Sequence, residues 1–88
     1  MIKLKCFMKY KGCESYTSKE GKESILYAFE DDEGHIEKFK LENVDVSELT
    51  EENIDKWFQC TFNHWHQNKN GFKVYTMFKS VTPVKENN

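Results

Sequence analysis

The chain has 88 residues, enough for one small domain with a modest hydrophobic core. Aromatic residues make up 15 % of it, so Phe, Tyr and Trp supply much of the apolar mass. No apolar run approaches the roughly 20 residues that span a bilayer, and the N-terminus lacks a signal-peptide core, so we expect no membrane partner. The three cysteines, Cys6, Cys13 and Cys60, lack disulfide-scaffold spacing, which predicts reduced thiols in the cytoplasm.

The sequence pattern predicts three strands in the first half of the chain. Residues 2–10 alternate as in a half-buried strand, with Ile2, Leu4, Cys6 and Met8 on one face and the lysines and Phe7 on the other. A polar loop follows, and residues 24–30 and 35–41 form a hairpin around the acidic turn "DDEG".

The register of that hairpin is open. A three-residue loop at 32–34 points Tyr27 and Phe29 inward with Phe39, whereas a two-residue loop at 33–34 places them outside.

The second half adds a short helix and two strands. Ser47 or Thr50 can cap a helix within residues 47–56, and residues 57–67 and 72–81 form a hairpin around Asn70-Gly71. Pro83 ends the last strand, so we expect one domain over residues 1–83 and a frayed tail over 84–88. Some aromatic residues are assigned to the core outright: Phe39, Trp57, Phe58, Phe62 and Phe78.

The element order β-β-β-α-β-β predicts a mainly β protein, a small five-stranded OB-fold-like barrel with one short helix. An SH3-like barrel or an α+β sheet are the alternatives.

Charge is segregated along the chain. Residues 1–28 carry a net charge of +3, residues 29–56 carry −8 and residues 57–88 carry +3, although the total is only −2. Partner choice follows local potential, so both ends of the chain suit an anionic partner.

A metal site or a catalytic site is not indicated. His64, His66 and Cys60 fall on one face of a strand, but the cysteine spacings contain no zinc-type pair. No phosphate loop or activated nucleophile is recognisable, so we expect no enzyme activity, no metal and no cofactor. The remaining cysteines are expected to be buried as small hydrophobes.

Lysines and aromatic residues interleave in three places: the first strand, the loop after it and the last hairpin. Single-stranded nucleic acid is bound by this combination, because cations follow the phosphates and rings stack on bases. The candidate residues are Lys3, Lys5, Phe7, Lys9, Tyr16, Lys19, Lys22, Trp65, Lys69, Phe72, Lys73 and Tyr75.

Several segments resemble single-stranded-DNA-binding proteins. "YAFEDDEGHIEKF" is similar to the strand–acidic turn–strand segment of OB-fold members. The opening "MIKLK", the "GK" at 21–22 and the closing "VTPVK" are similar to the gene V protein family of filamentous phages. The resemblance implies an OB-fold homodimer with a basic wing at about residues 12–24 and an aromatic contact near Phe72. The sequence departs from the family at Phe78 and Ser80, which replace basic residues, and in the acidic stretch 42–55.

The resulting hypothesis is sequence-tolerant binding of single-stranded nucleic acid, expected to be DNA, by a cytoplasmic protein of a phage or mobile element. The absence of arginine favours low sequence selectivity, because arginine makes the commonest base-specific contact. The alternative is an interaction module or inhibitor that docks its acidic 29–56 segment, through Glu48, Glu51 and Glu52, on a basic protein surface.

Overall fold

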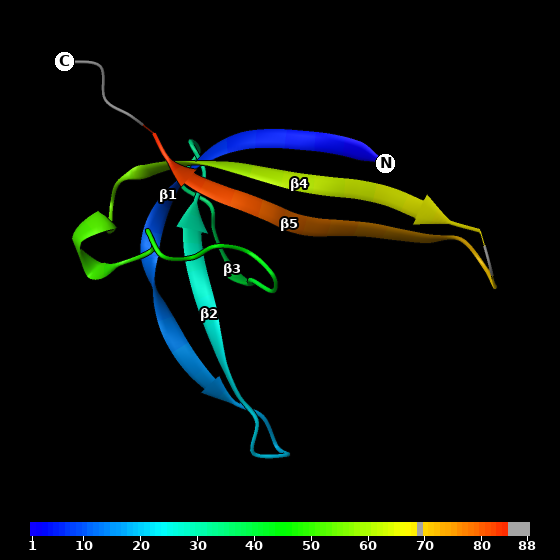
Figure 1. The fold of residues 1–88 in the computed structure, drawn as a ribbon, viewed down its shortest axis with the longest axis horizontal. Helices are drawn as coiled ribbons and strands as arrows, with labels where there is room; N and C mark the ends of the chain where they lie inside the picture. Colours follow the sequence, from blue (N-terminus) through cyan, green and yellow to red (C-terminus); the bar gives the residue numbers. More distant parts are fainter. Residues whose placement is uncertain (69, 85–88) are drawn as a thin grey trace.

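A computed structural model describes residues 1–68 and 70–84 as five antiparallel strands in one sheet (Figure 1). The order across the sheet is β3-β2-β1-β4-β5, so β1 is central. The expected mainly β fold is confirmed, and β2 to β5 begin and end within two residues of their predicted limits. The strands are β1 (Ile2–Thr17), β2 (Glu23–Glu30), β3 (Ile36–Lys40), β4 (Trp57–Gln67) and β5 (Lys73–Pro83).

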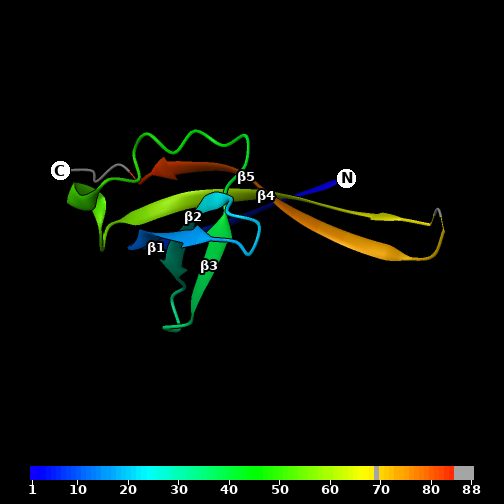
Figure 2. The same cartoon turned by 90° about the horizontal axis from the view of Figure 1, so that it is seen from below.

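Strand β1 is longer than predicted and belongs to two hairpin-like arms. Its first half pairs with β4, and its second half pairs with β2, with a register shift between Tyr10 and Gly12. Gly12 has φ 111°, so it marks a bulge inside the strand rather than the start of a loop. The β1–β2 arm and the β4–β5 arm therefore leave the core in different directions (Figures 1 and 2).

The core is mostly aromatic and lies between the two arms. Tyr10 packs against Phe29 and Phe58, with ring centroids 5.6 and 6.1 Å away. Phe39 of β3 meets Phe78 of β5 at 5.3 Å, so side chains join the two outer strands of the curled sheet. The core assignments of Phe58 and Phe78 are confirmed, and Phe39 and Phe62 are partly buried against the core.

Two sequence expectations about burial are wrong. Trp57 is 39 % exposed, because it and the buried Phe58 are neighbours on a strand and must face opposite sides. Ile2 and Leu4 are also exposed, since no second layer from residues 1–68 or 70–84 covers the start of β1.

The register of the β2–β3 hairpin matches the three-residue alternative. The Asp31 amide donates to the His35 carbonyl at 2.9 Å, which leaves residues 32–34 as the loop. Phe29 is buried and Tyr27 packs against the core, both on the inner side with Phe39.

The helix predicted within residues 47–56 is only a single 3-10 turn, Glu51–Asn53. Thr50 makes no side-chain capping bond, Ile54 is extended and Asp55 has φ 71°, so nothing continues the turn. A segment this short forms a helix only when packing supports it. Residues 41–49 cover the core. Leu49, just before the turn, is the buried residue of this segment. In the described residues, no helix is long and apolar enough to cross a membrane.

Candidate nucleic-acid interface

One face of β1, β4 and β5 carries most of the predicted site, and we call it the lysine face. Successive side chains of a strand point to opposite sides, and Lys5 lies opposite Thr61 while Trp65 lies opposite Tyr75. Register and alternation therefore place one set of side chains together: Lys3, Lys5, Phe7, Lys9, Trp57, Gln59, Thr61, Asn63, Trp65, Gln67, Lys73, Tyr75, Met77, Ser80 and Thr82.

The lysine face contains no carboxylate. Within the described chain, Asp and Glu occur only between Glu14 and Asp55, outside the first half of β1 and outside β4 and β5. Among the described residues, Lys3 and Lys5 form no ion pair, whereas Lys38 and Lys40 pair with glutamates on the β1–β2–β3 side. The positive charge at Lys3 and Lys5 is therefore not offset by an ion pair, whereas the charge of Lys9 acts on Asp55 and helps to lower the pKa of that carboxyl group.

Aromatic rings stand among these lysines. Trp65 and Tyr75 stack with centroids 5.2 Å apart and planes 14° from parallel. The Lys9 ammonium lies 5.4 Å from the centre of the Trp57 ring, a cation–π arrangement. Phe7 is 53 % exposed between Lys5 and Lys9. These rings offer flat apolar surface beside positive charge.

Phe72 belongs to the opposite side of the β4–β5 arm. Its ring stacks on His66 at 5.4 Å, and His66 alternates with Trp65 along β4. His64 is on the same side as His66, with its Nδ1 2.7 Å from the Thr76 hydroxyl. In the part of the chain that the structure describes, no three His, Cys, Asp or Glu side chains group as metal ligands.

Three other predicted binding residues, Tyr16, Lys19 and Lys22, lie on the β1–β2 arm, away from the lysine face. Tyr16 lies on β1 rather than in a loop, and it is 53 % exposed. Lys19 and Lys22 occupy the tip, which the Ser18 amide closes by donating to the Lys22 carbonyl at 2.8 Å. This tip and the tip of the β4–β5 arm lie far apart (Figure 1). Lys69, predicted at the β4–β5 turn, lies outside the described residues.

Two residues near the lysine face were absent from the predicted site. Trp57 was assigned to the core, although alternation from Trp65 along the predicted strand would have found it. Lys79 sits at a bulge, where Thr61 lies opposite Ser80 and Phe62 lies opposite Phe78. No sequence signal marks this bulge, but alternation from Tyr75 and Met77 along the predicted strand would have placed Lys79 on this side.

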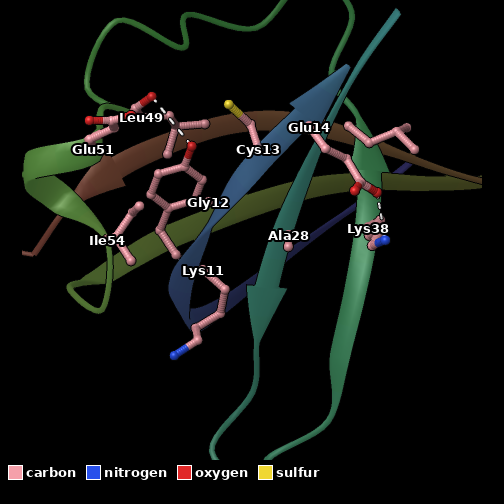
Figure 3. Close-up of a pocket in the computed structure, with 11 residues that line it drawn as sticks. Lys11, Gly12, Cys13, Glu14, Ala28, Lys38, Leu49, Glu51 and Ile54 are labelled. Atoms are coloured by element: carbon pink, nitrogen blue, oxygen red, sulfur yellow. Dashed lines mark hydrogen bonds and ion pairs between the residues drawn. The ribbon is translucent and has the colours of Figure 1, made fainter. Parts of the chain in front are cut away.

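A hollow of about 560 Å³ lies elsewhere, between the β1–β2 arm and residues 49–54 (Figure 3). Gly12 and Ala28 line it with small side chains, and the Tyr10 hydroxyl donates to the Leu49 carbonyl at 3.5 Å. Glu14 pairs with Lys38 there, and Glu51 adds another carboxylate. These acids make the hollow a poor place for phosphate.

The cysteines differ in environment. Cys60 is fully buried, and burial raises the pKa of its thiol to about 12. Burial also raises the pKa of Cys6, which is partly covered. Cys13 is exposed, so the expectation of burial is wrong for this residue, because it follows the bulge on the solvent-facing arm.

No protein-family model, curated protein or solved structure matches the chain.

Proposed function

We propose that this protein binds single-stranded nucleic acid, DNA in the first place, through the lysine face. The observation that carries the proposal is a sheet surface with lysines and exposed rings but no carboxylate. Such a surface attracts phosphates and offers stacking to unpaired bases, and it requires no chemistry.

In this proposal the lysines and the aromatic residues have different roles. Lys3, Lys5, Lys9 and Lys73 neutralise phosphates, and each is a point charge without the planar fork that reads guanine. Sequence selectivity is therefore low and salt sensitivity is high.

The rings supply the stacking platforms. Base–aromatic stacking contributes about 1–3 kcal/mol per base. Trp57 and Trp65 stand eight residues apart on β4, which at about 3.3 Å per residue corresponds to roughly 26 Å of track. Phe7 and Tyr75 lie beside this track on the neighbouring strands. This length suits a site of several nucleotides.

The tip of the β1–β2 arm, where Lys19 and Lys22 stand beside Glu20 and Glu23, provides a second and weaker contact with the nucleic acid. The resemblance of this segment to a phage DNA-binding wing supports that role, and it supports a phage or mobile-element origin. The exposed Cys13 thiol suits the reducing cytoplasm in which such strands occur.

The test is a titration of intrinsic tryptophan fluorescence with oligo-dT at two salt concentrations. Both tryptophans lie on the lysine face, so binding is expected to quench their emission at low salt and much less at high salt. Unchanged emission at low salt, with no mobility shift of the oligonucleotide, would refute the proposal.

A further inference from the structure

A hollow of about 330 Å³ lies beside the start of β1, where it meets β4 and β5. This volume falls in the roughly 300–1,000 Å³ range of small-molecule sites. Lysines from two strands line it together with apolar and polar side chains: Met1, Lys3, Leu4, Lys5, Thr61, Phe62, Asn63 and Lys79. Its lining therefore combines apolar surface with three ammonium groups.

Lys79 follows Lys73, Tyr75 and Met77 in the alternation along β5, and it lies at the bulge of this strand. Since Ser80 pairs with Thr61 and Phe78 pairs with Phe62, Lys79 is the extra residue without a partner on β4. Bulges redirect a side chain and often occur beside functional sites. Here the residue at the bulge is a cation that lines the hollow together with Lys3 and Lys5.

The positive charge of the hollow is uncompensated. No carboxylate lines it, and among the described residues none of its three lysines forms an ion pair. Three like charges around one hollow repel one another, so an anion bound there would relieve the repulsion.

Asn63 adds a polar group without a partner. Its Oδ1 is buried and accepts no hydrogen bond from the described residues. Buried polar atoms normally have partners, so this exception calls for an explanation. A base amino or imino group would supply the donor after displacing the side chains that cover the oxygen.

We infer that this hollow is a subsite for one nucleotide unit, with the phosphate held by Lys3, Lys5 and Lys79 and the base against the apolar lining. The inference rests on the proposed function and adds Lys79 as a binding residue. The hollow then fixes the position of the nucleic-acid strand, whereas stacking on the rings along β4 allows the nucleic acid to slide.

The first test compares Lys79→Gln with Lys40→Gln, which removes the same charge from β3, where Lys40 pairs with Glu42. Affinity for oligo-dT is measured over a range of salt concentrations. Loss of one phosphate contact should reduce the slope of log K against log salt by about 0.7 for Lys79→Gln. The slope of Lys40→Gln should equal that of the wild type. Equal slopes for both variants and the wild type would overturn the subsite and leave the proposed function intact.

The second test uses thymidine monophosphate with NMR detection on the wild-type protein and on Lys79→Gln. The nucleotide should shift the amide signals of Thr61 and Asn63, and the variant should bind it several-fold more weakly. Thymidine alone should bind less well than its monophosphate. If inorganic phosphate binds as well as the nucleotide, the site is a simple anion hole and the nucleotide assignment is wrong. If the nucleotide binds but oligo-dT does not, the proposed function fails while the hollow remains a mononucleotide site.

Discussion

At the residue scale, the stacked pair of Trp65 and Tyr75 is the clearest candidate for base contact. Trp65 is half-buried against its partner, so Trp65→Ala removes a preorganised platform rather than a mobile ring. We expect oligo-dT affinity to fall about 5- to 150-fold, which corresponds to the roughly 1–3 kcal/mol of one stacked base. Fluorescence anisotropy of a labelled oligonucleotide measures this change and does not depend on the tryptophan signal.

Phe72→Ala is the matched control for that experiment. Phe72 is 69 % exposed and belongs to the same arm, but its ring stacks on His66 on the opposite side. Its removal should therefore change oligo-dT affinity less than two-fold. A larger loss of affinity for Phe72→Ala than for Trp65→Ala would show that the nucleic acid binds the Phe72 side of the arm and not the lysine face.

The cysteines permit a second prediction at this scale. At pH 8 a thiol reagent should modify Cys13 quickly and Cys60 only after unfolding, because Cys60 is buried and its raised pKa keeps it protonated. Timed labelling with mass spectrometry of peptides identifies each site, and Cys13→Ser should abolish the fast phase. Labelling of Cys60 at the rate of Cys13 would contradict the burial that the structure shows.

At the element scale, the sequence predicted what depends on alternation. The register of β4 and the inward side of Phe58 follow from a period of two, and so does the outward side of Trp57 when the rule is applied consistently. The bulges at Gly12 and Lys79 interrupt that period, and a local pattern cannot reveal them. The predicted residues in the first half of β1 and on β4 consequently lie on one face. Phe72 lies on the other side of the β4–β5 arm, where the turn places it, and Lys79 was not predicted although alternation from Tyr75 reaches it.

The positive φ at the Gly12 bulge predicts a loss of stability when the glycine is replaced. Its φ of 111° is strained for any residue with a Cβ, although the new methyl group would meet only Ile54 Cδ1, at 3.7 Å. Gly12→Ala should therefore reduce the free energy of unfolding by about 1–3 kcal/mol through backbone strain. Urea denaturation monitored by circular dichroism gives the value.

Gly21→Ala provides the comparison for Gly12→Ala. Gly21 also has a positive φ, 83°, but it lies at the open tip of the β1–β2 arm with no atom nearby. The tip can relax without disturbing the core, so we expect a smaller loss of stability. Equal losses would show that the bulge is not specially constrained by its position beside the core.

At the scale of the whole molecule, the fold turns the segregation of charge along the sequence into a segregation of charge on the surface. The first half of β1 pairs with β4, which pairs with β5, although some 50 residues separate β1 from β4 in the chain, and this arrangement unites the two basic ends. The described acidic residues remain in the second half of β1, in β2 and β3, and in the loops between Thr17 and Trp57. The arms divide the basic residues again, since Lys19 and Lys22 lie on the β1–β2 arm.

This division makes the contribution of each arm measurable. The pair Lys3→Gln and Lys5→Gln should reduce the salt slope of oligo-dT binding by about 0.7, because both lysines hold the one phosphate of the subsite. The pair Lys19→Gln and Lys22→Gln removes the same charge from the other arm, and a smaller reduction is expected. A larger effect at the β1–β2 tip would move the principal site from the lysine face to that arm.

The acidic segment supplies the last prediction, which also separates the two hypotheses drawn from the sequence. Glu48, Glu51 and Glu52 are exposed and lie outside the lysine face, so replacing all three with glutamine removes only long-range repulsion of phosphate. Oligo-dT affinity should rise a few-fold at low salt. The gain should disappear near 0.15 M salt, where the screening length is about 8 Å. Affinity that falls in the triple variant would place these glutamates in the binding site. A variant that keeps oligo-dT binding but loses a cationic protein partner retained by the wild type would support docking through the acidic segment.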